Sequence, residues 1–183
     1  MKNILVICGA EKAGHSEGRY NRSLTEAAVS LLSSTFSVVT TYIEEGYDIE
    51  AEQEKFKQTD SVIWQFPVFW FHCPSSMKQY LDRVFVRGVF FERRVPYGTG
   101  GLMGGRTYLL SSTWNAPKEA FNDPGTFYEG CSVDDALIAM HKANQYVGMT
   151  PLPSFTVHNV IADPRYEENE ARWLSHLQRV YAL

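Results

Sequence analysis

The chain has 183 residues, of which 44% are hydrophobic and 21% charged, and its formal net charge at pH 7 is −4. This length and balance predict a single globular domain over residues 1–183 with a sizeable hydrophobic core. The acidic balance, without any run of basic residues, argues against DNA, RNA or an anionic membrane as a partner.

Apolar patterns predict strands and helices that alternate along the chain. In chain order, we expect a strand over 3–8, a helix from 21, a strand over 36–43, a charged helix over about 48–59, a strand over 60–66, a helix following 74–76, a strand over 106–112, a helix over 133–147, a strand over 154–160 and a helix over about 166–181. This alternation predicts a doubly wound α/β fold. With the first strand central, five parallel strands with helices on both faces suit the order 2-1-3-4-5 of flavodoxin-like sheets.

Short patterns bear on location and redox state. The apolar run Ile4 to Cys8 is too short for the core of a signal peptide, and no stretch approaches the length of a membrane span. Cys8, Cys73 and Cys131 are odd in number, far apart and free of any Cys-x-x-Cys pair. We therefore expect a cytoplasmic protein without disulfides.

Several kinds of catalytic site are disfavoured by spacing. The five histidines have no metal-ligand pattern: His15, His72, His141, His158 and His176. A Gly-x-Ser-x-Gly elbow and a Walker-type Gly-Lys-Ser or Gly-Lys-Thr are absent from the sequence. The glycine-rich run 98–105 fails as a dinucleotide fingerprint, because Met103 stands in the place of the last glycine and a strand follows. We expect no metal site.

Five aromatic rings fall within the eight residues 64–71, where a buried strand gives way to a loop broken by Pro67. Ligands of open α/β sheets bind outside the carboxyl ends of the strands, so a flat apolar ligand would meet these rings. An aromatic cluster is also an ordinary component of a core. The rings alone leave both interpretations open.

Two other loops are predicted to reach the same edge. In the loop before the first helix, Ser16, Gly18, Asn21 and Ser23 suit a phosphate, since the first N–H groups of a helix lack partners. An ordinary capped helix start is the alternative. The loop 111–117, which includes Trp114, is also aromatic and would either wall a ring or seal the core.

Many blocks of the chain, in order, resemble flavodoxin-like NAD(P)H:quinone oxidoreductases from end to end. The earlier blocks are Asn3-Ile4-Leu5, Gly9-Ala10, His15-Ser16, Val62-Ile63-Trp64-Gln65, Pro67 and Trp70. The later blocks are Tyr97-Gly98, Gly100-Gly101-Leu102, Thr113-Trp114-Asn115-Ala116-Pro117, Glu119-Ala120-Phe121, His141-Lys142-Ala143-Asn144-Gln145, Gly148-Met149 and Pro151-Leu152-Pro153.

This resemblance implies a homodimer that binds FAD, rather than FMN, and passes a hydride from NADPH to the flavin and then to a quinone, in a two-electron ping-pong reaction. NADPH is implied in preference to NADH, although the residues themselves do not decide between them. The implied cofactor-binding residues are Ser16, Gly18, Tyr20, Asn21, Arg22 and Ser23 around the pyrophosphate, with Pro67, Val68, Phe69, Trp70, Phe71, Tyr97, Thr113, Trp114, Asn115 and Ala116 around the ring system.

The chain departs from the family pattern at two places. It has Val68-Phe69-Trp70 where relatives commonly have Gly-Trp-Trp, and its 86–96 segment is shorter. That segment carries Arg87, Arg93 and Arg94, which would either meet the phosphate of NADPH or lie on a solvated surface. His72 is a candidate proton donor to a quinone oxygen, with a simple rim position as the alternative.

The principal alternative to a quinone reductase is a regulatory subunit, because similar flavin-binding proteins act as regulatory subunits of potassium efflux systems. A flavodoxin that only carries electrons is disfavoured, because such carriers are strongly acidic and have a phosphate loop rich in threonine and glycine, which this chain lacks.

Overall fold

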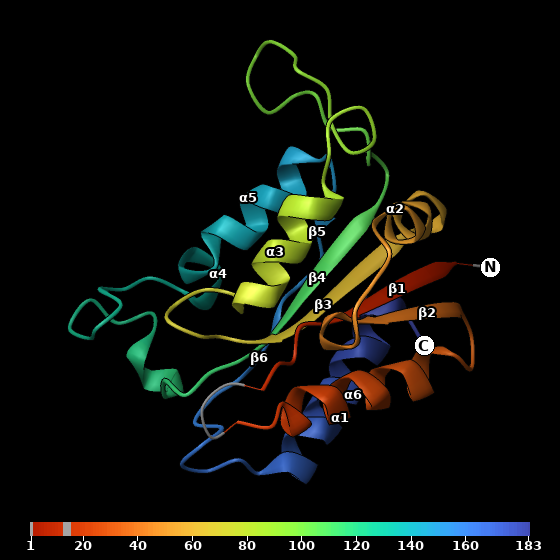
Figure 1. Cartoon of the computed structure of the whole chain (residues 1–183). Coiled ribbons are helices and arrows are strands. Elements are labelled where there is room, and N and C mark those ends of the chain that lie inside the picture. The colour runs from red at the N-terminus through yellow and green to blue at the C-terminus, as the bar shows by residue number, and fades with distance from the viewer. Residues whose placement is uncertain (1, 13–15) are drawn as a thin grey trace.

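The computed structural model describes residues 2–12 and 16–183, and a twisted parallel sheet forms its middle layer (Figure 1). The strands are β1 (Asn3–Cys8), β2 (Ser37–Tyr42), β3 (Ser61–Pro67), β4 (Thr107–Thr113), β5 (Thr150–Pro151) and β6 (Phe155–Val157). Their order is β2-β1-β3-β4-β5, with β6 also paired to β4, and every pairing is parallel. The predicted order and the flavodoxin-like architecture are confirmed.

Helices cover both faces of the sheet (Figure 1). On one face, α1 (Arg19–Leu32) and α6 (Tyr166–Tyr181) pack on side chains such as Ile4 and Val6. The other face is covered by α2 (Ile49–Gln58), α3 (Ser75–Val84), α4 (Val133–Ala136) and α5 (Ile138–Tyr146), with two short 3₁₀ turns, η1 (Ile43–Glu45) and η2 (Lys118–Ala120). Successive side chains of a strand point to opposite faces, so β1 and β3 are buried on both sides.

Two predicted elements differ in the structure. The strand expected over 154–160 is the shorter β6, which ends at Val157, and the two-residue β5 beside β4 was not predicted. Pro151 and Pro153 have no N–H to donate, so the ladder cannot run unbroken through this segment. The helix expected over 133–147 is interrupted at Leu137, whose backbone leaves the helical region (φ −96°, ψ 19°) while its side chain enters the core.

The parallel strands bring four loops to one edge of the sheet. The chain leaves β1, β3, β4 and β6 at their carboxyl ends, and these ends lie together in Figure 1. The connection from α3 to β4, residues 85–106, instead projects from the opposite, amino edge. Within the described residues, no helix is both long and apolar enough to cross a membrane.

Candidate functional site

A buried polar network fastens the carboxyl edge of the sheet to the start of α1. Nε2 of Gln65 donates to Oδ1 of Asn21 (2.8 Å), and Nδ2 of Asn21 donates to Oγ1 of Thr113 (2.9 Å). Oγ of Ser111 donates to Oε1 of Gln65 (2.6 Å). All four residues are at most 5% exposed, so these polar groups depend on one another for partners. The network fixes α1, β3 and β4 relative to one another.

The first turn of α1 presents N–H groups to this edge. Gly18 is the N-cap, with φ of +71°, and among the described residues no side chain caps the helix there. The first turn also contains no acidic residue. Ser16 approaches the same place, since its Oγ accepts from the N–H of Gly18 (3.3 Å). Unpaired N–H groups at the positive end of a 14-residue helix suit a diphosphate.

The other predicted residues of this segment point elsewhere. Asn21 uses its amide in the buried network. The guanidinium of Arg22 bonds to the carboxylates of Glu44 and Glu45 on η1. The hydroxyl of Tyr20 donates to the carbonyl of Pro164 (2.7 Å), which ties α1 to the loop before α6. These side chains position the helix start, whereas its backbone faces the edge. His15 lies outside the described residues.

The loop after β3 forms a tight turn with two aromatic side chains at its tip. Phe69 and His72 exchange backbone hydrogen bonds of 2.9 and 3.1 Å, and the two residues between them, Trp70 and Phe71, have φ of +48° and +65°. Glycine and asparagine normally occupy such positions, because a Cβ is strained there. Trp70 is nevertheless 92% exposed and Phe71 51% exposed. Strained backbone that displays exposed rings is typical of a ligand-binding site rather than of a core.

His72 has a defined hydrogen-bonding arrangement in this turn. Its Nδ1 accepts from the backbone N–H of Cys73 (2.9 Å) and lies 3.1 Å from the Cys73 sulfur. In the neutral ring the proton is therefore on Nε2. Burial raises the pKa of Cys73 to about 12, so its thiol stays protonated. The half-buried His72 can present an N–H donor at this edge.

The loop after β4 contributes backbone rather than a ring. Trp114 is 2% exposed and its Nε1 donates to Oγ of Ser112 (2.8 Å), so its indole belongs to the core. The sequence left open whether this ring flanks a ligand or seals the core, and its position in the structure is that of a ring that seals the core. Asn115 is exposed, and Ala116 is held through its carbonyl, 3.2 Å from Nδ1 of His158. Pro67 is buried at the end of β3, while Val68 and Phe69 are half-buried beside the loop.

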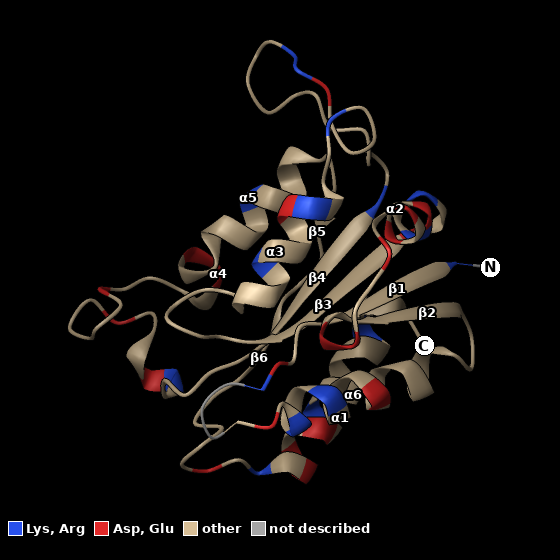
Figure 2. Ribbon diagram, viewed as in Figure 1, with Lys and Arg blue, Asp and Glu red and all other residues tan. Residues whose placement is uncertain are grey.

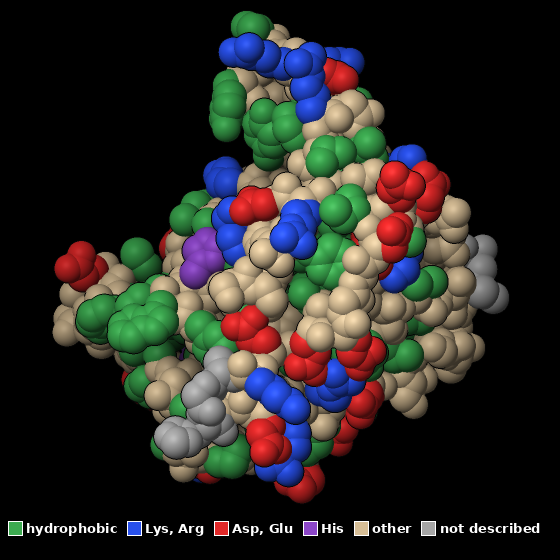
Figure 3. Space-filling view, in the orientation of Figure 1, with side chains coloured by type: hydrophobic (Ala, Val, Ile, Leu, Met, Phe, Trp, Pro, Cys, Tyr) green, Lys and Arg blue, Asp and Glu red, His purple; other side chains and the backbone are tan. Residues whose placement is uncertain are grey.

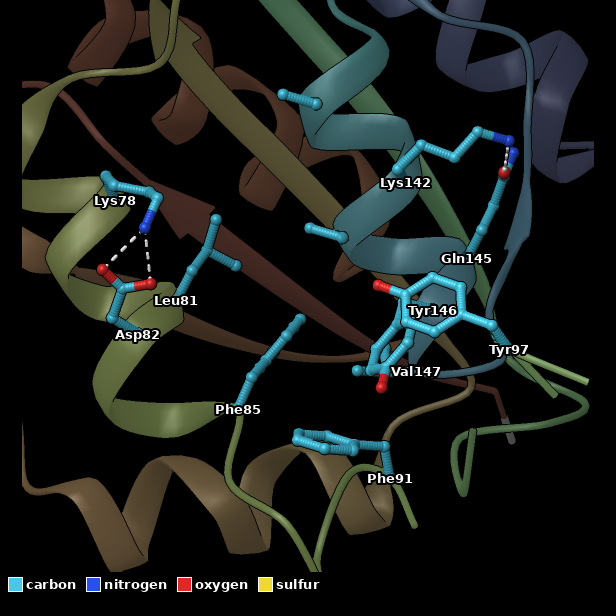
Figure 4. A pocket seen from close by; sticks show the side chains of 13 residues that line it. Lys78, Leu81, Asp82, Phe85, Phe91, Tyr97, Lys142, Gln145, Tyr146 and Val147 are labelled. Atoms are coloured by element: carbon cyan, nitrogen blue, oxygen red, sulfur yellow. Dashed lines mark hydrogen bonds and ion pairs between the residues drawn. The ribbon is translucent and has the colours of Figure 1, made fainter. Parts of the chain in front are cut away.

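Tyr97 and the three arginines do not share this edge within one chain. They belong to the connection 85–106 at the amino edge, where Figure 2 shows basic residues on the projecting loop. Tyr97 is 89% exposed. It lines a groove of about 880 Å³ between α3 and α5, where its ring centroid lies 5.4 Å from that of Tyr146 (Figure 4).

That groove is sizeable, but its walls carry little chemistry. Leu81, Phe85, Phe91 and Tyr146 give it an apolar lining. The charged groups at its rim are already paired, as Lys78 bonds to Asp82 and Lys142 bonds to Oε1 of Gln145. The polar donors converge at the carboxyl edge instead. We therefore take the carboxyl edge as the candidate functional site.

Residues that sequence reasoning missed hold the candidate site together. Gln65 and Ser111 are polar side chains inside otherwise apolar strands, and that break in pattern was the available signal. His158, just beyond β6, contacts the carbonyl of Ala116, and Phe127 stacks on Phe71. Neither contact has a local signature, since each joins segments far apart in the sequence.

Comparisons with known proteins agree with this fold. A family model described as a flavodoxin-like fold, Flavodoxin_2, matches residues 1–177. The chain is 40% identical to NADPH:quinone oxidoreductase MdaB of Haemophilus influenzae, over 98% of this chain and 99% of that protein. Human ribosyldihydronicotinamide dehydrogenase [quinone] is 38% identical over a shorter region, which covers 43% of this chain and 33% of that protein.

Two solved structures are also similar. A Klebsiella pneumoniae protein described as a candidate quinone reductase superposes with a TM-score of 0.81 and 22% identity, covering 99% of this chain and 85% of that one. General stress protein 14 of Treponema denticola, solved in complex with FMN, has a TM-score of 0.73 and 25% identity, covering 100% and 99% of the two chains. The chain belongs to the family of flavodoxin-like NAD(P)H:quinone oxidoreductases.

Proposed function

We propose that the chain is an FAD-dependent NAD(P)H:quinone oxidoreductase that works as a homodimer. The observation that carries this proposal is the meeting, at one edge, of an uncapped helix start and a strained turn with exposed aromatic rings. The buried network of Asn21, Gln65 and Thr113 holds the two features in register. Phosphate chemistry and a flat ring are the two parts of a flavin nucleotide.

The residues present suit a flavin at this edge. In the proposal, the pyrophosphate lies against the segment from Ser16 to Ser23 and is held by the Ser16 hydroxyl and the N–H groups of the first helical turn, residues 19–21. The side chains of Tyr20, Asn21 and Arg22 fix that turn. A Cβ on Gly18 would combine its positive φ with an approach of 3.3 Å to Ala10, so glycine is needed where the backbone turns into the helix. Residues 67–71 and the backbone of residues 113–116 would flank the isoalloxazine.

A bound flavin supplies the hydride chemistry between a nicotinamide and a quinone. In overall balance, NAD(P)H, a quinone and one proton give NAD(P)⁺ and the hydroquinone. We assign His72 a positioning part, in which its Nε2–H would donate a hydrogen bond to a quinone oxygen while the proton of the hydroquinone comes from solvent. FAD is proposed over FMN, and NADPH over NADH, on the family resemblance, and the free cysteines support the cytoplasmic location included in the proposal.

The homodimer would explain the position of Tyr97. This exposed side chain lies at the amino edge, so it can reach a carboxyl-edge site only on a second copy. The apolar groove between α3 and α5 offers surface that a second copy would bury. Sedimentation should therefore give the mass of two chains. A mass of one chain at micromolar concentration would rule the homodimer out.

Initial rates test the reaction itself. With NADPH varied at several fixed concentrations of a quinone, one shared site used in turn predicts parallel lines in double-reciprocal plots. Intersecting lines would contradict the ping-pong scheme while leaving the reductase assignment standing. An absence of quinone-dependent NAD(P)H oxidation by flavin-loaded protein would contradict the reductase and favour a regulatory subunit.

A further inference from the structure

Two helices begin at the carboxyl edge without a cap of their own. Among the described residues no side chain caps α1 at Gly18, and α3 begins after Pro74, which has no polar side chain. Neither helix has an acidic residue in its first turn. The fourth N–H of each helix bonds to the cap carbonyl, from Arg22 to Gly18 (3.1 Å) and from Lys78 to Pro74 (2.9 Å). The earlier N–H groups of both helices therefore need acceptors from elsewhere.

α3 receives its acceptor from Glu11, in the loop after β1. Oε2 of Glu11 accepts from the N–H of Ser76 in the first turn of α3 (3.2 Å), across 65 positions of sequence. A carboxylate is favoured there, because the N-terminus of a helix carries partial positive charge. Oγ of Ser76 is buried and Glu11 is half-buried, so water has limited access to this contact. The contact is a charge-assisted hydrogen bond between a loop and a helix.

Glu11 also contacts the start of α1, through its backbone. A Cβ on Gly18 would lie 3.4 Å from both the backbone nitrogen and the backbone oxygen of Glu11, so the two residues pack closely. Two residues earlier, a Cβ on Gly9 would come within 2.4 Å of Cε of Met77 on α3. Residues 9–11 therefore lie against α3 and support the N-cap of α1.

The start of α1 lies on a surface of mixed charge. Figure 3 shows acidic and basic side chains intermingled around α1 on the face in view. The guanidinium of Arg22 is already paired with Glu44 and Glu45. Phosphate binding at this helix start then depends mainly on its N–H groups, and such hydrogen bonds weaken steeply when they are misaligned. The orientation of the first turn of α1 is therefore important for affinity.

We propose that Glu11 is a positioning residue for the phosphate site. Its carboxylate fastens the loop after β1 to α3, and its backbone thereby holds Gly18 and the first N–H groups of α1 in the orientation that binds a pyrophosphate. This inference rests on the proposed function, because the ligand is the pyrophosphate of the flavin. In this role Glu11 does not touch the ligand, and its negative charge is offset by the N-terminus of α3. The hydrogen bond to Ser76, rather than the charge, is what phosphate binding requires.

The test compares three ligands that carry different parts of the cofactor. FAD has both the pyrophosphate and the ring system, riboflavin has the ring system alone, and inorganic pyrophosphate has no ring. Titration calorimetry of the flavin-free protein gives the affinity for each. Glu11→Ala should weaken binding of FAD and of pyrophosphate by about 2- to 12-fold, the effect of one hydrogen bond, and leave riboflavin unchanged. Glu11→Gln, whose amide oxygen can still accept from Ser76, should retain the wild-type affinities.

Asp48→Ala is the matched control. Asp48 caps α2 in the same manner, since its Oδ1 accepts from the N–H of Ala51 (2.8 Å), but this bond stays within one segment of the chain. Urea titration should show that Asp48→Ala and Glu11→Ala both lower the stability of the flavin-free protein. Only Glu11→Ala should weaken the binding of FAD and pyrophosphate.

The role of Glu11 would be overturned by equal losses of FAD and riboflavin affinity, by the same losses in Asp48→Ala, or by a loss in Glu11→Gln as large as in Glu11→Ala. Unchanged or tighter binding of pyrophosphate by Glu11→Ala would overturn it as well, since repulsion by the charge would then match or exceed the positioning effect. Wild-type protein that binds pyrophosphate in a Glu11-dependent manner but neither flavin would refute the proposed function and keep the role of Glu11. Wild-type protein that binds none of the three ligands would refute both.

Discussion

Asn21, in the first turn of α1, accepts a hydrogen bond of 2.8 Å from Gln65 at the carboxyl end of β3, 44 residues later in the chain. Both side chains are buried, and Nδ2 of Asn21 donates in turn to Oγ1 of Thr113 on β4. Through this one amide, the helix start that would hold phosphate and the loops that would hold a ring are kept at fixed spacing. A flavin bound at this edge would need both at once, so in the proposed function the network would serve affinity as well as stability.

Replacement of Asn21 by leucine should lower the free energy of unfolding by about 1–3 kcal/mol, because it leaves the buried Nε2 of Gln65 without its acceptor. The double variant Asn21→Leu/Gln65→Leu should be less destabilised than the sum of the two single changes, as expected for coupled groups. Urea titration of the apoprotein measures both. Glu26→Gln, on the exposed side of α1, is the matched control and should stay within about 0.5 kcal/mol of wild type. Strict additivity of the two leucine changes would show that the bond contributes nothing.

We expect a substitution of Trp70 to affect apoprotein stability and flavin affinity in different ways. Trp70→Asn removes a ring that is 92% exposed and places at φ +48° a residue that tolerates this conformation. We expect the free energy of unfolding of the apoprotein to stay level or rise by up to about 1 kcal/mol, while flavin affinity falls by about 2- to 12-fold. Trp70→Phe, which keeps both ring and strain, should resemble wild type in both measurements. A clear loss of apoprotein stability in Trp70→Asn would mean that the ring packs on the fold.

The pH dependence of stability follows from two histidines. Burial is the main cause that lowers the pKa of both His158 and His176 below 6.5 in the folded chain. The unfolded chain then binds more protons between the folded pKa and 6.5, so stability is fully present above about pH 6.5 and is lost as pH falls through the folded pKa values. His158→Gln and His176→Gln should each flatten this slope in urea titrations. Of the two histidines, His158 bonds to Ala116 and His176 to Pro153, so only the replacement of His158 should also change the pH dependence of flavin binding. Equal effects of both changes on flavin affinity would contradict that role.

Local patterns allowed the sheet order and the edge of the site to be predicted, because buried parallel strands are long apolar runs and ligands meet their carboxyl ends. The details that depend on contacts between distant segments could not be read in this way. The position of Trp114 after β4 was compatible with a ring that flanks a ligand, but its side chain is buried in the core, where its indole N–H donates to Ser112. The strand expected over 154–160 did not include β5, although Pro151 and Pro153, which cannot donate to a ladder, explain why β5 has only two residues. The stacking of Phe127 on Phe71 had no such local sign.

The central claim is that the carboxyl edge binds a flavin and passes reducing equivalents from NAD(P)H to a quinone. The most direct measurement is to release the cofactor from purified protein for identification by mass, and to follow the visible spectrum of the intact protein anaerobically as NADPH and then a quinone are added. We expect FAD, bleaching of its colour by NADPH, and return of the colour with one equivalent of quinone. Protein that neither carries nor takes up a flavin, or a reduced flavin that the quinone leaves bleached, would contradict the account.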